Sequence, residues 1–291
     1  MPAIVLDLDD SIGAVAEAVR IPCDAHATAL RFACSRRALN AFAHELDDKL
    51  PVRYGTVFTG SGDFHHLSLP LIARAAARSG PLEVVVFDNH PDNMRFLFGV
   101  HCGSWVRRAA FLPGVAHVHV VGITSTDIGA GHAWENYLRP LYAGRVTYWS
   151  AGVDTRWAWR VGLKRAFRSF ASVDKLLDAF VAQMGSSRRP VYLSIDKDVL
   201  STQAARTNWD QGQMSEAGLV RAIDVLRGRV VASDITGEVS VAQLGVWWKR
   251  ALSALDHQPP VLPDELARWQ SQQHALNLRL LDVIDDASID A

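Results

Sequence analysis

The feature that most constrains the fold is an alternation of short β-branched runs with stretches of helical periodicity. Apolar residues recur at helical spacing in residues 171–184 and 215–228. Strand-like runs occupy residues 3–9, 54–60, 82–88, 115–123, 145–152, 190–196 and 229–235. The run "VVVF" at 84–87 is continuously apolar, as expected for a strand buried on both faces. The alternation therefore predicts an α/β fold, with a mainly parallel sheet covered by helices on both faces.

The segments between these elements are short, which predicts a single α/β domain over residues 1–291. Clusters of Pro, Gly and Ser at 184–190 and 256–265 have the length of turns, and no internal repeat is present. The pattern further predicts a buried helix at 246–255 and a final helix at 263–287.

Composition limits the class of partner. The chain has 291 residues, of which 49% are hydrophobic, so it can bury a core without a disulfide or metal staple. Its 30 basic and 31 acidic residues nearly cancel, which disfavours nucleic acid and anionic membranes as partners. We therefore expect a small-molecule partner.

The cysteines and the apolar runs point to the cytoplasm. Cys23, Cys34 and Cys102 are odd in number and form no CxxC pair, as in proteins of a reducing compartment. No apolar run reaches the roughly 20 residues that a membrane span requires. The first residues turn acidic where a signal peptide would still be apolar.

Polar side chains gather where three predicted strands end. The ends of parallel strands meet at one edge of a sheet, which is where ligands bind in open α/β folds. Alternate residues of an extended chain point the same way, so a DxHxD or DxD pattern presents its side chains together. The candidate residues are Asp63, His65 and His66, then Asp88, His90 and Asp92, and finally Asp196 and Asp198.

A divalent cation explains this convergence best. Clustered carboxylates repel one another unless a cation lies between them, and Mn²⁺-like ions accept a mixture of carboxylate and imidazole ligands. One such motif at a strand end is more often a turn or a helix cap than a metal ligand. Three motifs at successive strand ends favour the metal site.

The motifs "GSGDFHH", "DNHPD" and "SIDKD" resemble the ordered metal signatures of the ureohydrolase family (arginase, agmatinase, formimidoylglutamase), whose usual forms are GGDH, DAHxD and SxDxD. The resemblance covers Gly60 to Glu238. It implies a three-layer αβα sandwich with two manganese ions per chain. The ligands that it implies are Asp88, His90, Asp92, Asp196, Asp198 and His65, with His66 left open as the alternative to His65 because Phe64 separates Asp63 from both.

The resemblance implies hydrolysis of a linear C–N bond in a guanidino or amidino substrate. Two cations that share one solvent molecule lower its pKa, which gives a hydroxide nucleophile near neutral pH. Glu238 resembles the family's substrate-orienting Glu, with Gly237 as one extra residue before it. Cys102 stands at the family's proton-shuttle His, so either His101 takes over that role or the chemistry differs.

Departures from the family pattern leave the substrate open. Lys197 replaces an apolar residue between Asp196 and Asp198, and "TNWDQGQMS" at 207–215 replaces a Gly/Pro-rich loop. Asn208, Trp209 and Asp210 would then form part of a different pocket wall. Arginine, agmatine, another guanidino acid, a formimino compound and a peptidyl arginine all stay possible. Relatives commonly form trimers or hexamers, so a homo-oligomer is possible.

Two alternatives remain. In the first, the chain is a noncatalytic member of the family that keeps the metal site. In the second, it is a haloacid-dehalogenase-type phosphatase that uses Asp7 and Asp9 in "DLDDS". The phosphatase hypothesis leaves the clusters at Asp88 and Asp196 unexplained. His117 and His119 share one face of a predicted strand, but no third ligand is evident in the sequence.

Overall fold

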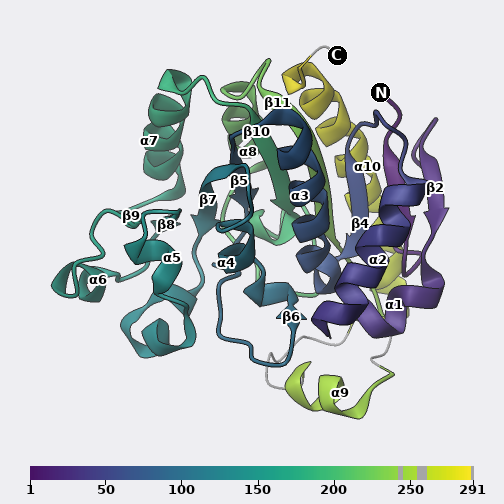
Figure 1. The fold of residues 1–291 in the computed structure, drawn as a ribbon, viewed down its shortest axis with the longest axis horizontal. Helices are drawn as coiled ribbons and strands as arrows, with labels where there is room; N and C mark the ends of the chain where they lie inside the picture. Colours follow the sequence, from purple (N-terminus) through teal and green to yellow (C-terminus); the bar gives the residue numbers. More distant parts are fainter. Residues whose placement is uncertain (242–244, 254–260, 290–291) are drawn as a thin grey trace.

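A nine-stranded parallel sheet forms the centre of the protein (Figure 1). The computed structural model describes residues 1–241, 245–253 and 261–289. The strand order is β2-β1-β4-β11-β10-β5-β7-β8-β9, and every neighbouring pair is parallel. The strands are β1 (Ile4–Asp7), β2 (Val19–Pro22), β4 (Val57–Ser61), β5 (Leu82–Phe87), β7 (Val115–Ile123), β8 (Val146–Ala151), β9 (Phe167–Phe170), β10 (Val191–Asp196) and β11 (Val230–Glu238). The predicted parallel α/β sheet is confirmed.

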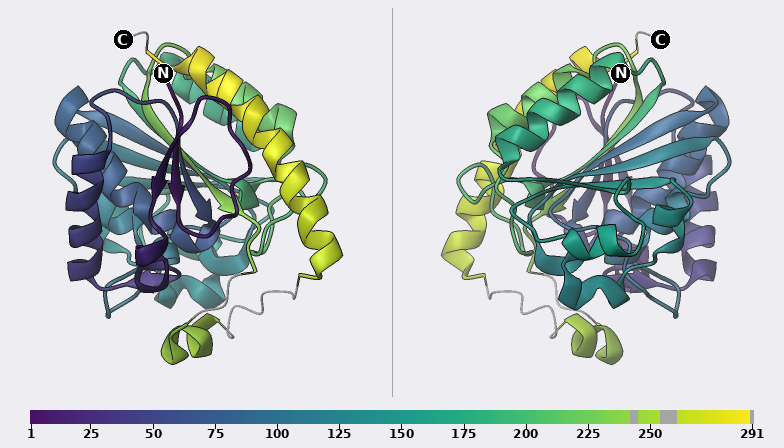
Figure 2. Two further views of the ribbon diagram at one scale, coloured as in Figure 1. Left: turned by 90° about the vertical axis from the view of Figure 1, so that its right-hand side faces the viewer. Right: turned by 90° about the vertical axis from the view of Figure 1, so that its left-hand side faces the viewer.

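Helices cover both faces of this sheet, which makes the fold a three-layer αβα sandwich (Figure 2). One layer contains α1 (Asp24–Leu30), α2 (Arg36–Lys49), α3 (Ser68–Ser79), α4 (Val106–Ala109), α5 (Arg139–Tyr142) and α6 (Arg156–Arg160). The other contains α7 (Val173–Ser186), α8 (Glu216–Asp224) and α10 (Pro263–Ala287). Each layer closes a separate apolar core against its face of the sheet. In the described residues no helix is long and apolar enough to cross a bilayer.

Local sequence signals account for where several helices begin. The hydroxyls of Ser35, Ser172 and Ser215 accept hydrogen bonds from backbone amides in the first turns of α2, α7 and α8. A hydroxyl at this position satisfies an amide that has no partner within the helix. The predicted helices at 171–184, 215–228 and 263–287 therefore match α7, α8 and α10 closely.

The shortest elements carry the weakest sequence signals. The strand-like runs do not include β2 and β9, which are four-residue strands at the two edges of the sheet. An edge strand pairs on one side only, and β2 exposes three of its four residues, so it needs no continuous apolar run. A two-stranded antiparallel sheet of β3 (Ala33–Cys34) and β6 (Val100–His101) is also not predicted.

Helix α9 (Trp247–Ser253) differs from the buried helix predicted at 246–255. Trp247 is 73% exposed, so the helix does not bury this apolar side chain as the prediction requires. The buried side chain is instead the polar Lys249. The Lys249 ammonium donates hydrogen bonds to the carbonyls of Thr28, Ala29 and Arg31 at the end of α1. A cation is favourable there because the last carbonyls of a helix have no partners within it. Residues 254 and 255 lie outside the described residues.

Short 3-10 helices follow several strands at the carboxyl edge of the sheet. They are η1 (Gly62–Leu67), η2 (Cys102–Ser104), η3 (Thr126–Ile128), η4 (Ala130–Glu135) and η5 (Lys197–Val199). Two of them, η1 and η5, continue directly from β4 and β10. Two of the candidate ligand motifs, "GSGDFHH" and "SIDKD", lie in these strand-to-helix turns, and "DNHPD" lies in the turn after β5.

Candidate metal centre

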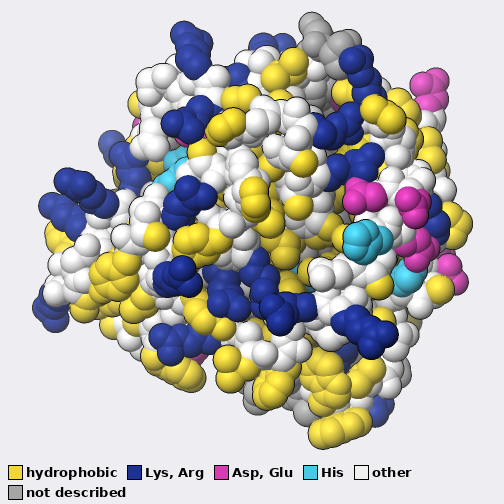
Figure 3. Space-filling view, in the orientation of Figure 1, with side chains coloured by type: hydrophobic (Ala, Val, Ile, Leu, Met, Phe, Trp, Pro, Cys, Tyr) yellow, Lys and Arg dark blue, Asp and Glu magenta, His cyan; other side chains and the backbone are white. Residues whose placement is uncertain are grey.

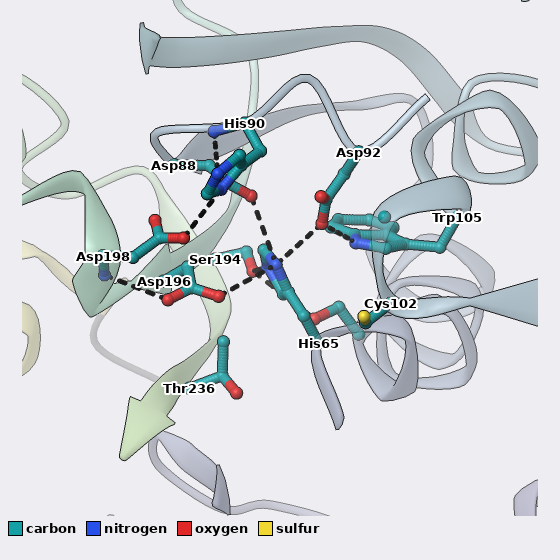
Figure 4. Close-up of polar contacts among 12 residues, drawn as sticks. His65, Asp88, His90, Asp92, Cys102, Trp105, Ser194, Asp196, Asp198 and Thr236 are labelled. Carbon is teal, nitrogen blue, oxygen red and sulfur yellow. Dashed lines mark hydrogen bonds and ion pairs between the residues drawn. The ribbon is translucent and has the colours of Figure 1, made fainter. Parts of the chain in front are cut away.

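The three sequence motifs meet at the carboxyl edge of the sheet (Figure 4). His65 lies in η1 after β4, Asp88 directly follows β5, and Asp196 ends β10. Strand β10 pairs with β5, and only β11 separates it from β4, so the three strand ends lie close together. The register of the parallel sheet thus brings together residues that are up to 131 positions apart in the sequence.

Two groups of potential ligands share Asp88. The first is His65, Asp88 and Asp196, and the second is Asp88, His90 and Asp198. Within each group the ligand atoms lie within 4.8 Å of one another. A carboxylate common to two such groups is well placed to bridge two cations.

His65 occupies the middle of the first group. Its Nδ1 lies 3.3 Å from Asp88 Oδ2, 3.4 Å from Asp196 Oδ2 and 2.9 Å from Asp92 Oδ2. His66 is fully buried and does not line the cavity above these residues. Between the two alternatives left open by the sequence, the geometry therefore favours His65.

His90 and Asp198 form the second group together with Asp88. His90 Nδ1 lies 2.8 Å from Asp198 Oδ2 and 3.6 Å from Asp88 Oδ1. The backbone fixes both carboxylates, since the amide of His90 donates to Asp88 Oδ1 at 2.6 Å and that of Asn89 donates to Asp198 Oδ1 at 3.0 Å. Their second oxygens remain directed toward the cluster.

The electrostatics of the cluster show a deficit of positive charge. Burial, reinforced by the neighbouring Asp198, raises the pKa of Asp196 well above the usual range. Burial and the charge of Asp88 raise the pKa of Asp92 to about 7. Burial opposes protonation of His65, but the contacts with Asp88 and Asp92 outweigh it and raise the pKa of that imidazole. Without a metal, protons must supply the charge that carboxylates at this spacing require.

One buried oxygen of the ligand cluster forms no hydrogen bond. Asp88 Oδ2 is inaccessible to solvent and has no hydrogen-bond partner among the described residues, although it belongs to the carboxylate shared by both groups. Its contact with His65 Nδ1, 3.3 Å away, is an ion pair only when that imidazole is protonated. A buried carboxylate oxygen without a donor is costly unless a cation lies beside it. Oxygen and imidazole donors together suit manganese or a similar divalent ion. The residues present therefore fit a pair of such ions.

A second set of contacts orients the ligand side chains. His65 Nε2 lies 3.1 Å from the Ser194 hydroxyl, which donates to Asp234 Oδ1 at 2.8 Å. Ser68 and Tyr192 also donate to Asp234. Such outer contacts fix the ring orientation of a histidine ligand. Sequence reasoning missed this support, although the serine of "SIDKD" could have indicated it.

Asp92 is held by its own contacts. Trp105 Nε1 donates to Asp92 Oδ2 at 2.6 Å, and the backbone of Asp92 has a positive φ of 45°. Outside glycine this conformation is uncommon, although Asp tolerates it better than most residues. The turn that carries "DNHPD" is thus constrained around this side chain.

A cavity of about 550 Å³ opens above the cluster. Its lining includes Trp209 and Asp210 from the loop that differs from the family pattern, together with Asp127 and Glu135, which sequence reasoning missed. None of the described residues that line it is Lys or Arg. Asn208 instead hydrogen-bonds the backbone of Ser240. The cavity therefore suits a cationic or neutral ligand better than an anion.

Comparison with known proteins identifies the family. The family model described as "Arginase family" matches residues 23–237. The chain belongs to the arginase family. The resemblance of the three motifs to the ureohydrolase family is thereby confirmed.

Individual relatives are distant. An uncharacterized protein from Thermotoga maritima is 29% identical over 242 residues, which cover 82% of this chain and 72% of that protein. The agmatine ureohydrolase of Thermoplasma volcanium matches in structure with a TM-score of 0.53 at 12% identity, covering 98% of this chain and 90% of the other. Trypanosoma cruzi formiminoglutamase with Mn²⁺ gives a TM-score of 0.51 at 15% identity, with coverages of 94% and 76%. The structural matches show the arginase-like fold.

Glu238 does not lie where its predicted role requires. It is 2% exposed, pairs with the ammonium of buried Lys197 at 2.5 Å and accepts a hydrogen bond from Asn277 at 2.6 Å. It is absent from the lining of the cavity. The carboxylate expected to orient a substrate is thus bound to a cation of the protein itself.

The extra residue Gly237 explains this displacement. The pairing of β11 with β4 shifts register between Ile235 and Thr236 and again between Thr236 and Glu238, and the second shift marks a bulge at Gly237. Asp234 contacts Ser68 of α3, whereas Glu238 contacts Asn277 of α10 in the opposite layer. Residues four apart on a regular strand share one face, so the bulge reverses the direction of Glu238.

His101 lines the cavity, as does its neighbour Cys102. The imidazole Nδ1 accepts a hydrogen bond from the Gly103 amide at 2.9 Å, which leaves the proton of the neutral ring on Nε2. Burial lowers the pKa of His101 to about 4, so the ring is neutral at pH 7. A proton shuttle at His101 stays a prediction, and it would start from a neutral ring.

The residues of the phosphatase hypothesis form ordinary ion pairs. Asp7 contacts Arg20 at 3.3 Å, and Asp9 contacts Arg31 at 2.9 Å and accepts a hydrogen bond from Ser11. Neither belongs to a metal-binding group found among the described residues. Together with the family assignment, these contacts argue against the phosphatase.

Replacing Lys197 with Ala is expected to destabilise the fold strongly. The change leaves the buried Glu238 carboxylate without its cation, and breaking a buried pair in this way typically costs about 3 to 5 kcal/mol. Urea unfolding measures the loss, with exposed Lys175→Ala as the control. The double variant Lys197→Met, Glu238→Gln should recover most of it. A cost for Lys197→Ala no larger than that of the control would contradict a structural role of the pair.

The pH dependence of stability should report the burial of His101. Its pKa is about 4 when folded and near the ordinary histidine value of 6.5 when unfolded. The unfolded chain therefore binds more protons between these values, and stability is lost as the pH falls from about 6.5 to 4. His101→Asn keeps an acceptor for the Gly103 amide but does not titrate. As the pH falls from about 6.5 to 4, urea unfolding should show that this variant gains stability relative to wild type. A difference in unfolding free energy that stays constant over this pH range would contradict the assignment.

Proposed function

We propose that the protein is a hydrolase that uses two manganese ions to cleave a linear C–N bond in a guanidino or amidino substrate. The observation that carries the proposal is the pair of ligand groups that share Asp88. Membership in the arginase family supports a ureohydrolase-type reaction. The proposed ligands are His65, Asp88, His90, Asp92, Asp196 and Asp198.

The proposed chemistry divides between the ions and the protein. Manganese bound here would lower the pKa of a water molecule and so supply a nucleophile near neutral pH. The ligand side chains would hold both ions at a rigid edge of the sheet, and the Ser194 and Asp234 contacts fix the ring of His65. Their part is to fix the geometry before the substrate enters.

The charge of the cavity supports a cationic substrate group. Asp127, Glu135 and Asp210 line it outside the ligand set, and no lysine or arginine is among its described lining residues. Carboxylates at these positions would hold a guanidinium or amidinium group against the reacting centre. With Glu238 bound to Lys197, we propose that these rim residues take over the orientation of the substrate.

A noncatalytic role is the second candidate, and the Lys197–Glu238 pair favours it. An internal cation occupies the carboxylate that the family resemblance assigns to the substrate. Such a protein would bind metal and ligand without releasing product. The cytoplasmic location and the small-molecule partner remain part of the proposal in either case.

Product release distinguishes the two candidates. The manganese-loaded chain is incubated with guanidino, amidino and formimino compounds, and urea, ammonia, formamide and free amines are measured. We expect product from at least one class, lost in Asp88→Asn and retained in Asp174→Asn, an exposed residue of α7. Binding of these compounds without product would support the noncatalytic member. Equal turnover by Asp88→Asn would contradict the proposed centre.

A further inference from the structure

A second cavity lies at the opposite edge of the sheet from the candidate metal centre. It has a volume of about 780 Å³. Its lining residues come from β5, β7, β8 and β9, from the end of α7 and from the segments before β9 and β10. It is therefore separate from the cavity above Asp88.

The floor of this cavity is unusually polar for the interior of an α/β protein. His117 and His119 lie on one face of β7, and His119 pairs in register with Thr147 on β8. Strands covered on both faces normally present apolar side chains at such positions. The two histidines, for which the sequence shows no third metal ligand, thus belong to a polar surface beneath α7. A local departure from the apolar pattern of this kind is expected at functional sites.

Hydrogen bonds fix the protonation of the two histidines. Trp149 Nε1 donates to His119 Nδ1 at 3.3 Å, so the proton of neutral His119 resides on Nε2. His119 is 3% exposed, yet this Nε2 is neither hydrogen-bonded nor sealed from solvent among the described residues. His117 lies 3.1 Å from the Gly144 carbonyl and 2.9 Å from the Thr147 hydroxyl. The N–H of His119 is left as a buried donor open to the cavity.

Cationic side chains surround this donor. Arg168 is held in place by a hydrogen bond to Gln183, and its guanidinium carbon lies 4.2 Å from the ring centre of Trp149. The remaining cationic lining residues are Lys164, Arg165 and Arg189. Lys and Arg side chains are also prominent on this part of the surface, on the left of Figure 3 near α6 and α7.

One acidic residue lines the cavity, and it is already engaged. Glu83 accepts a hydrogen bond from Ser187 at 3.0 Å and lies 4.0 Å from Arg189 Nε. The four cations thus exceed the acidic charge of the described lining. This balance is opposite to that of the cavity above Asp88, where acidic residues occur without Lys or Arg among the described lining residues.

We propose that the cavity beneath α7 binds a phosphate group, either as inorganic phosphate or as the phosphate of a small monoester. Arginine guanidinium groups present several donors that match phosphate oxygens. A fixed imidazole N–H adds a directed donor at the floor of the cavity. The site differs from the candidate metal centre in position, in charge and in the class of ligand that it selects.

Isothermal titration calorimetry of the manganese-loaded chain tests this proposal with inorganic phosphate and with glycerol 3-phosphate. Glycerol is the uncharged control, and sodium chloride keeps the ionic strength constant. We expect saturable binding of at least one of the two phosphates at one site per chain. Tighter binding of glycerol 3-phosphate would identify a monoester, and equal or weaker binding would identify inorganic phosphate as the ligand.

Variants of the lining residues test whether the phosphate measured by calorimetry binds in this cavity. Arg168→Gln and the double variant Arg165→Gln, Arg189→Gln should each weaken binding about tenfold or more, which corresponds to roughly 1.4 kcal/mol. The double variant changes exposed residues only, so it tests the site even if Arg168→Gln fails to fold.

Two controls separate this site from other sources of binding. The matched control Arg221→Gln, Arg227→Gln removes two exposed charges on the side of α8 and should leave binding unchanged. Asp88→Asn should also leave it unchanged, which excludes phosphate bound at the metal centre. Absence of saturable phosphate binding would overturn the proposal. Equal weakening of binding by the cavity double variant and by the control double variant would also overturn it.

Discussion

The repulsion among buried carboxylates at the carboxyl edge of the sheet is the constraint on which the rest of the site depends. Asp88 lies in both ligand groups, and its Oδ2 forms no hydrogen bond among the described residues. Ordinary side-chain contacts do not satisfy such a cluster, because His65 and His90 can contribute positive charge only by taking up protons. Two divalent cations would neutralise the carboxylates and leave both rings free to act as neutral ligands.

The Lys197–Glu238 ion pair is a feature that the family resemblance did not predict. A bulge at Gly237 turns Glu238 toward α10, where Lys197 and Asn277 bind its carboxylate. A Cβ at Gly237 would lie 2.4 Å from Asp196 Oδ1, so this position must be glycine for the ligand to keep its place. The same bulge thus makes room for a proposed metal ligand and removes the carboxylate expected to orient the substrate. Recognition of the substrate then falls to the rim of the cavity.

The sequence predicted the sheet and the convergence of the ligand motifs because both follow from strong local patterns. Apolar runs define the central strands, and the strand-end motifs place Asp88 and Asp196 at one edge whatever the details of the loops. The direction of Glu238 could not be predicted, because a bulge reverses the face of a strand without changing its apolar pattern. The partner of Lys197 depends on contacts with α10, and the contributions of Asp127 and Glu135 depend on loop conformation. Contacts of this kind do not produce a periodic pattern in the sequence, so sequence analysis does not detect them.

The manganese content of the loaded and desalted chain tests the proposed two-metal centre most directly. Elemental analysis is applied to wild type, Asp88→Asn and Asp198→Asn, with circular dichroism confirming that each variant is folded. Because Asp88 belongs to both ligand groups and Asp198 to one, we expect about two ions for wild type, about one for Asp198→Asn and almost none for Asp88→Asn. Wild type without manganese, or Asp88→Asn with the same content as wild type, would contradict it.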